Sequence, residues 1–171
     1  SGSGTNLQAI IDAVAGGDIP ARIDQVISNR PGAGGLARAE RAGIGTEVLD
    51  HRAFAERGHY DAVLAERLEA IRPDLVVLAG FMRILTDDFV TRFMGRLINI
   101  HPALLPACRG LHTHQRAIDA GESRHGCSVH YVIPELDAGP VIAQAAVPIH
   151  AGDTAVGQGM VTGQESASSR V

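Results

Sequence analysis

The stretch that decides the fold is Leu75-Val76-Val77-Leu78-Ala79, which contains no polar side chain. A strand with one solvated face alternates apolar and polar residues, so this run predicts a strand covered on both faces. Such strands are typical of parallel sheets with helices above and below. Arg72-Pro73 stands just before the run and predicts the end of a helix, because the residue before proline disfavours helical geometry.

Helix and strand patterns alternate on both sides of this run. The first helix is predicted by an apolar stripe with i, i+3, i+4, i+7 spacing that Gly16-Gly17 ends. We expect helices over residues 7–15, 35–42, 60–71, 87–93 and 114–120, and strands over 21–28, 47–49, 75–79, 96–100, 128–132 and 141–149. This order predicts an α/β fold with an open, mostly parallel, doubly wound (Rossmann-like) sheet, whose function lies at the carboxyl ends of the strands.

Length and composition restrict the class of protein. The 171 residues are 45% hydrophobic and 20% charged, which predicts one soluble domain, and the apolar runs are too interrupted for membrane spans. The net charge of −4 argues against a nucleic-acid partner. All 15 basic residues are arginine, which excludes Schiff-base and Walker-type lysine chemistry. Cys108 and Cys127 lack metal spacing, so we expect a reduced, cytoplasmic location.

The two ends of the chain carry separate expectations. A glycine loop enters the first helix with no strand before it, so the domain, residues 1–153, is expected to be truncated at its front. Beyond about Thr154 the apolar periodicity stops, and residues 154–171 are expected to form a flexible tail.

Gly2-Ser3-Gly4-Thr5-Asn6-Leu7 is a candidate phosphate loop. Backbone amides and the positive end of the following helix can hold a phosphate there. The third glycine of the dinucleotide fingerprint is missing, as is lysine, so one phosphate monoester suits the loop better than a dinucleotide or a triphosphate. A purely structural turn, with Thr5 or Asn6 as helix N-cap, fits the same residues.

Asn99 and His101 are the candidate catalytic pair. Their i, i+2 spacing at the end of a strand places both side chains on one face. Acyl transfer needs an amide to hydrogen-bond an oxyanion and an imidazole to exchange a proton. A buried pair bonded only to backbone fits the spacing equally. Asp137, in the loop between two apolar strands, is a candidate partner that favours charged His101, although Glu135 and Asp137 also fit an ordinary solvated turn.

Two further features concern ligands. The segment Phe81-Met82-Arg83-Ile84-Leu85 follows the buried strand, and it either lines a pocket for a flat apolar ring or simply packs in the core. The chain has eight histidines, but it contains no His-Glu-x-x-His motif and no paired Cys-x-x-Cys motif. No metal site is therefore expected.

Several segments together resemble a known family. In chain order they are Ser1–Ile10, Leu78–Leu85, Asn99–Pro106, Gly110–His114 and Glu135–Asp137. They are similar to the phosphoribosylglycinamide formyltransferases, folate-dependent enzymes of purine synthesis, and the resemblance extends over nearly all of residues 1–153. It implies transfer of a formyl group from 10-formyltetrahydrofolate to the amine of glycinamide ribonucleotide, with no metal and no covalent intermediate.

The resemblance also implies roles for particular residues. Asn99 would hydrogen-bond the formyl oxygen, His101 would act as the acid, and Asp137 would keep that imidazole protonated. The residues that match the family's ligand segments are Gly4, Thr5 and Asn6 for the ribonucleotide phosphate, and Arg57, Met82, Arg83, Ile84 and Leu85 for the folate. The implied partners are these two small molecules, and the implied state is a monomer or a weak homodimer.

The chain departs from the family pattern in three places. It lacks the family's first strand and its amphipathic C-terminal helices, and Arg109-Gly110 stands where the family usually has Pro-Gly. Methionyl-tRNA formyltransferases and formyltetrahydrofolate deformylases share the Asn-x-His and Asp chemistry but carry an additional domain. The alternatives to formyl transfer are therefore a formyltetrahydrofolate hydrolase and an inactive, truncated protein that only binds a ligand.

Overall fold

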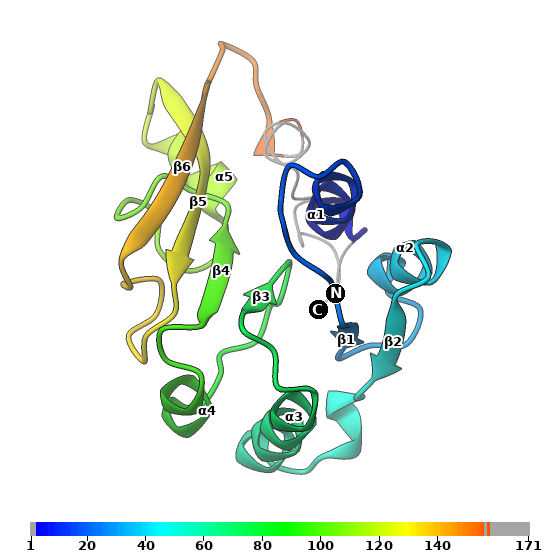
Figure 1. Cartoon of the computed structure of the whole chain (residues 1–171). Helices are drawn as coiled ribbons and strands as arrows, with labels where there is room; N and C mark the ends of the chain where they lie inside the picture. The colour runs from blue at the N-terminus through cyan, green and yellow to red at the C-terminus, as the bar shows by residue number, and fades with distance from the viewer. Residues whose placement is uncertain (1–2, 156, 158–171) are drawn as a thin grey trace. The chain divides into compact units, whose positions relative to one another are not determined.

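The computed structural model describes residues 3–155 and 157 (Figure 1). These residues form two compact units. Within the described residues, the first unit comprises 3–74 and 79–92, and the second comprises 75–78, 93–155 and 157. Most of the tail predicted at 154–171 lies outside the described residues.

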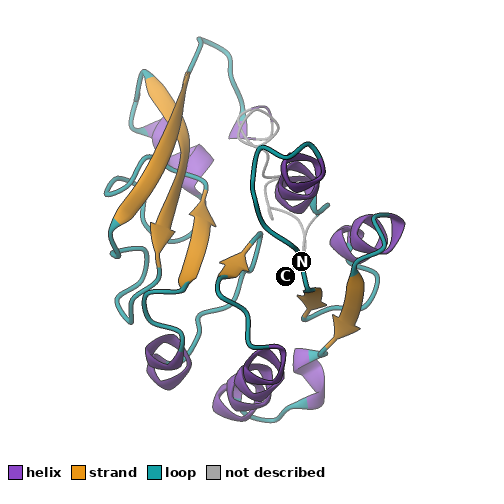
Figure 2. Cartoon of the chain, viewed as in Figure 1, coloured by secondary structure: helices purple, strands orange, loops and turns teal. Residues whose placement is uncertain are grey.

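The first unit contains a short parallel strand pair (Figure 2). Its elements are α1 (Thr5–Ala15), β1 (Gln25–Ser28), α2 (Gly34–Arg41), β2 (Gly45–Val48), the 3₁₀ helix η1 (His51–Ala53), α3 (Arg57–Ile71) and α4 (Asp87–Arg92). Helix α2 packs on α1, β1 and β2, and α3 packs on α4. The buried residues Leu36 and Ala39 of α2 and Leu64 of α3 form parts of its core.

The end of α3 follows the local sequence rule. Arg72 caps the helix in the left-handed conformation, with φ of 54°, and its N–H donates to the Leu68 carbonyl at 3.0 Å. Pro73 follows and has no N–H with which to continue the helix. The predicted stop at Arg72-Pro73 is therefore where the structure ends α3.

The second unit contains a four-stranded sheet in the order β3-β4-β5-β6. Its elements are β3 (Val76–Leu78), β4 (Leu97–His101), α5 (Thr113–Asp119), β5 (Arg124–Tyr131) and β6 (Val141–Pro148). Strands β3 and β4 are parallel, whereas β4 with β5 and β5 with β6 are antiparallel. Apolar runs reveal strands but not their direction, and mixed sheets of this kind are common among α/β proteins.

The predicted open α/β sheet is confirmed, with differences at the strand ends. Strand β1 covers only the last half of the predicted 21–28 stretch, because its partner β2 begins opposite Gln25 at Gly45. Strand β5 starts at Arg124, four residues before the predicted start at Ser128, because β6 offers it a partner up to Pro148. Pairing with a distant segment sets the first residue of both β1 and β5. A local sequence pattern carries no information on that pairing.

Among the described residues, no helix combines the length and the apolar character that crossing a membrane requires.

The sheet of the second unit should depend on Leu97, the fully buried first residue of β4. We expect Leu97→Ala to lower the free energy of unfolding by about 2–5 kcal/mol, because it removes buried methyl groups and leaves a cavity. Urea unfolding followed by circular dichroism measures the change. Met94→Ala is the control at a nearby exposed position and should change stability by no more than about 0.5 kcal/mol. Equal losses in both variants would contradict this account of the core.

Candidate active site

Strand register brings four polar side chains to one face of the second unit's sheet. Asn99 and His101 alternate along β4 and therefore share a face. In the antiparallel pairing with β5, His130 stands opposite Asn99 and Ser128 opposite His101. Directly opposite residues of an antiparallel pair point to the same side, so both β5 residues join the predicted pair.

The loop between β5 and β6 supplies the carboxylate. Asp137 has a φ of 49°, and its side chain is only 9% exposed. Its Oδ2 accepts the Gly110 N–H at 2.9 Å. Glu135 behaves differently, because its side chain is 70% exposed and pairs with Arg109 at 2.9 Å. Of the two predicted carboxylates, Asp137 faces inward and Glu135 is a surface residue.

The contact between His101 and Asp137 forms as the sequence predicts. Nδ1 of His101 lies 3.4 Å from Oδ2 of Asp137. Nε2 of the same ring lies 3.0 Å from the Cys108 carbonyl oxygen. Carbonyl and carboxylate oxygens only accept hydrogen bonds, so the ring satisfies both neighbours when each nitrogen carries a proton. The geometry thus suits a ring that donates protons.

His130 is a site residue that the sequence analysis does not single out. Its Nδ1 donates to the Tyr131 carbonyl at 2.9 Å, so Nε2 of the neutral ring is an acceptor. The Asn99 amide nitrogen lies 3.3 Å from that Nε2, and Oδ1 of Asp137 lies 3.6 Å from it. Burial lowers the pKa of His130, although the Tyr131 hydrogen bond and the Asp137 charge oppose the shift. A neutral His130 therefore orients the Asn99 amide.

The signal for His130 is present in the sequence but requires the strand pairing. Ser128 and His130 repeat the i, i+2 spacing of Asn99 and His101 within an apolar strand. The spacing places Ser128 and His130 on one face of β5. Only the antiparallel register puts that face beside the candidate catalytic pair.

Ser128 fixes the loop that follows β4. Its hydroxyl donates to the Ala103 carbonyl at 2.6 Å and accepts the Leu105 N–H at 3.0 Å. The Gln144 amide of β6 donates to the same hydroxyl at 2.8 Å and to the Leu105 carbonyl at 2.9 Å. The sheet thereby holds the loop that presents the Cys108 carbonyl to His101.

A second buried contact joins α5 to β5. Nδ1 of His114 lies 2.8 Å from Nε2 of His125, and both rings are buried. The His125 ring also hydrogen-bonds the Pro102 carbonyl, which accepts the Thr113 hydroxyl at 2.6 Å as well. Burial, reinforced by the neighbouring His125 and His101 rings, lowers the pKa of His114 to about 4, and burial also lowers the pKa of His125. Both rings are therefore neutral in the fold.

This pair should make stability depend on acid. The pKa of His114 is about 4 in the fold and about 6.5 in the unfolded chain, so the unfolded chain binds more protons between these values. Stability is therefore complete above pH 6.5 and should fall as the pH drops toward 4. Urea midpoints measured across this range should decline less steeply in His114→Gln than in the unchanged protein.

His150→Gln is the matched control, because His150 is exposed. It should keep the wild-type slope of stability against pH. Identical slopes in all three proteins would show that the buried pair does not link folding to protonation.

The candidate phosphate loop lies in the first unit. Helix α1 begins at Thr5 with Gly4 as N-cap, so neither Thr5 nor Asn6 is the N-cap. Gly4 has a φ of 78°, and a Cβ there would lie 2.6 Å from the Gly35 Cα. Only glycine fits this combination of backbone conformation and close approach. Gly4, Thr5 and Asn6 thus form the start of a helix whose N-cap residue makes no side-chain hydrogen bond.

The candidate folate segment also lies in the first unit. Met82 and Ile84 are 51% and 58% exposed, whereas Leu85 is buried. The segment therefore does not simply pack in the core. Its exposed apolar side chains, Met82 and Ile84, are available to a flat ring. The Thr86 N–H donates to the buried Asp61 carboxylate of α3 at 2.7 Å, which anchors the segment's end. Arg57 is exposed at the first position of α3.

Arg83 lies on an aromatic support. Its guanidinium carbon is 5.0 Å from the centroid of the buried Tyr60 ring. His51 meets the same ring edge to face, with centroids 6.4 Å apart. Burial raises the pKa of Tyr60 to about 12, so the ring remains neutral beneath the cation. Arg83 is predictable from the sequence, but this aromatic support is not, because it depends on the packing of α3.

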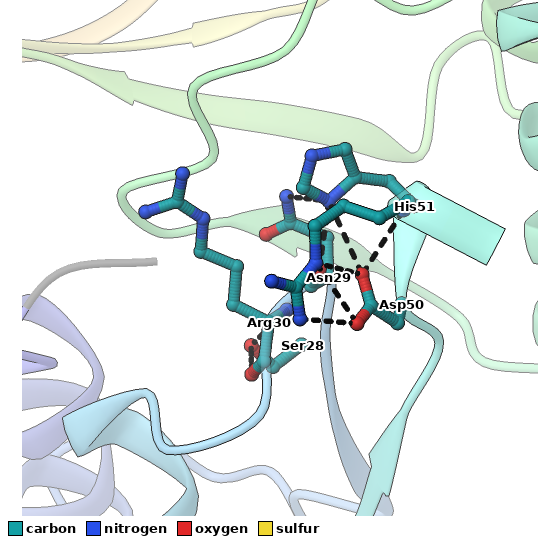
Figure 3. A network of polar contacts seen from close by, with 6 residues as sticks. Ser28, Asn29, Arg30, Asp50 and His51 are labelled. Atoms are coloured by element: carbon teal, nitrogen blue, oxygen red, sulfur yellow. Dashed lines mark hydrogen bonds and ion pairs between the residues drawn. The ribbon is translucent and has the colours of Figure 1, made fainter. Parts of the chain in front are cut away.

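His51 belongs to a polar network at the carboxyl ends of β1 and β2 (Figure 3). Its Nδ1 donates to the Asn29 carbonyl at 2.9 Å. Asp50 accepts the backbone N–H of Arg52 at 3.0 Å and pairs with the Arg52 guanidinium at 2.6 Å. The hydrogen bonds from Arg52 lower the pKa of Asp50 to about 2. The network fixes η1 and, through His51, the ring beneath Arg83.

In the part of the chain that the structure describes, no three His, Cys, Asp or Glu side chains are grouped so that they could hold a metal ion.

Comparison with known proteins identifies the class as transferases with an open α/β sheet. The Formyl transferase family model matches residues 1–161. The chain therefore belongs to the formyl transferase family.

Individual relatives agree with this membership. The chain is 53% identical over 154 residues to the phosphoribosylglycinamide formyltransferase of Escherichia coli (strain K12), covering 90% of this chain and 73% of that protein. It is 46% identical over 154 residues to the human trifunctional purine biosynthetic protein adenosine-3, covering 90% of this chain and 15% of that protein. A crystal structure of glycinamide ribonucleotide transformylase 1 from Symbiobacterium toebii superimposes with a TM-score of 0.92 at 48% identity, covering 95% of this chain and 77% of that chain.

Proposed function

We propose that the chain transfers a formyl group from 10-formyltetrahydrofolate to the amine of glycinamide ribonucleotide, a reaction of purine biosynthesis. The observation that carries this proposal is the 53% identity over 154 residues to the Escherichia coli phosphoribosylglycinamide formyltransferase. The contact of 3.4 Å between His101 and Asp137, at the end of the strand that carries Asn99, supports it with suitable chemistry.

Three side chains carry the proposed chemistry, and a fourth, His130, orients one of them. Formyl folate, when bound, supplies an electrophilic carbonyl carbon, which the amine attacks. The Asn99 side-chain amide has two protons. One is directed to Nε2 of neutral His130, and the other is available to donate to the oxygen on which negative charge develops. His101 supplies a proton to the folate nitrogen as its bond to the formyl carbon breaks, and the proton that the attacking amine loses returns to the His101 ring. Asp137 holds the imidazole in its protonated form.

His101 has to exchange one partner for this role. Both ring nitrogens face protein oxygens, at Cys108 and Asp137. The Cys108 carbonyl is neutral and the Asp137 carboxylate is charged, and charge-assisted hydrogen bonds are the stronger kind. The bond from Nε2 to Cys108 is therefore the one that a substrate replaces.

The remaining candidate residues bind the substrates. Gly4, Thr5 and Asn6 hold the phosphate of the ribonucleotide at the amino end of α1. The folate lies against Met82, Arg83, Ile84 and Leu85, with Arg57 nearby. Residues 1–153 act as one formyltransferase domain, and a cytoplasmic location and a monomer or weak homodimer remain predictions.

A formyl-transfer assay tests the proposal against its alternatives. The purified chain is given formyl folate with glycinamide ribonucleotide, and separately with water alone. We expect the formyl group to reach the amine only in the first reaction. Equal loss of formyl folate in both reactions would indicate a hydrolase, and no loss in either would indicate a protein that only binds ligands.

Replacement of His101 tests the proposed acid. We expect His101→Ala to lower kcat by ~10²–10⁴-fold, the usual effect of losing a positioned proton donor. Its urea midpoint at neutral pH reports whether the fold survives. His150→Ala, at an exposed position, is the control and should retain full activity. Unchanged turnover in His101→Ala would remove this residue from the mechanism.

A further inference from the structure

Arg38, on α2, is joined to the candidate phosphate loop of the first unit. Its Nε donates to the Ser3 carbonyl at 2.9 Å, and its Nη1 donates to the Gln8 side-chain oxygen at 3.2 Å. The guanidinium therefore spans the loop and the second turn of α1. Arg38 is half-buried, so these hydrogen bonds are partly shielded from water.

The backbones of α2 and the loop approach each other closely enough to hold this geometry. A Cβ at Gly34 would lie 2.7 Å from the Ser3 carbonyl oxygen, and a Cβ at Gly4 would lie 3.2 Å from the Arg38 Cδ. Such distances are shorter than ordinary carbon contacts. Glycine at both positions lets the start of α2 touch the loop, and Arg38 stands one turn further along the helix.

Positive charge accumulates at this point without a carboxylate on either helix end. Neither α1 nor α2 has a side-chain hydrogen bond at its N-cap or an acidic residue in its first turn. The amino end of a helix carries a partial positive charge. Two helix ends and the Arg38 cation near one loop disfavour each other unless an anion is present, so the arrangement suits a phosphate.

The hydrogen bond from Arg38 also sets the direction of the loop amides. In a trans peptide the C=O and the following N–H point to opposite sides. With the Ser3 carbonyl held by Arg38, the Gly4 N–H of the same peptide points away from the arginine. The glycine backbone is free to rotate otherwise, because it has no Cβ.

We infer that Arg38 is a positioning residue for the phosphate of the substrate: it holds the Ser3 carbonyl so that the Gly4 N–H faces the phosphate, and it adds positive charge behind the loop. This inference rests on the proposed function for the identity of the substrate. It assigns Arg38 no contact with the reacting atoms. Its effect therefore belongs to the binding of the phosphate-bearing substrate and not to the chemical step.

The test compares three variants of the full chain. Arg38→Gln removes the charge and the paired donors, Arg38→Lys keeps the charge, and Arg41→Gln removes an exposed arginine at the last position of the same helix. We expect Arg38→Gln to raise the KM for glycinamide ribonucleotide by about tenfold or more. The variant loses the charge-assisted hydrogen bond that holds the Ser3 carbonyl, and such a bond contributes about that factor. Its kcat and its KM for formyl folate should stay within about twofold, because uniform binding affects KM alone.

The other two variants bracket this result. Arg38→Lys should lie between Arg38→Gln and the unchanged protein, since it restores charge without the planar pair of donors. Arg41→Gln should match the unchanged protein. An unaltered KM for the ribonucleotide in Arg38→Gln would overturn the inference. A lower kcat together with higher KM values for both substrates would also overturn it, because that result would indicate a general loosening of the first unit.

Inorganic phosphate provides a readout that does not need the transfer reaction. Calorimetric titration with phosphate should give about tenfold weaker binding in Arg38→Gln than in the unchanged protein or in Arg41→Gln. Equal binding in all of them would overturn the role of Arg38. A chain that binds phosphate in this Arg38-dependent way but transfers no formyl group would instead overturn the proposed function alone.

Discussion

The Asp137 carboxylate meets three groups that come from separate parts of the second unit. Oδ2 lies 3.4 Å from His101 Nδ1 and accepts the Gly110 N–H, while Oδ1 lies 3.6 Å from His130 Nε2. A carboxylate that is 9% exposed is costly to bury unless charged or polar partners compensate for lost water. The strands, the loop after β4 and the loop before β6 must therefore all be in place for this interaction to form.

The buried histidines of the second unit are of two kinds. His101 faces acceptor oxygens at both ring nitrogens, so both nitrogens are positioned to donate hydrogen bonds. His114 and His125 face each other, and burial lowers the pKa of each, so they remain neutral and bind the loop to the sheet. The same side chain thus serves as a proposed proton donor in one place and as a packed, uncharged link in another. All three rings are buried, so their neighbouring groups make the difference.

The sequence is sufficient to predict site geometry where that geometry depends on short-range spacing. The i, i+2 spacing of Asn99 and His101 correctly predicts that they share a face, and the loop position of Asp137 correctly predicts its contact with His101. Short-range spacing does not identify His130, Ser128 or Arg38. Each acts on a segment far away in the chain, through strand register or through helix packing that only glycine permits. Local patterns contain no information on those distances.

A double-mutant cycle on kcat tests most directly whether His101 and Asp137 act as one unit in formyl transfer. The proteins compared are the unchanged chain, His101→Ala, Asp137→Ala and the double variant. If Asp137 acts through the His101 ring, the double variant should be no slower than His101→Ala, because residues that act as a unit are strongly non-additive. Losses that multiply in the double variant would show that the two side chains act independently and would contradict the account.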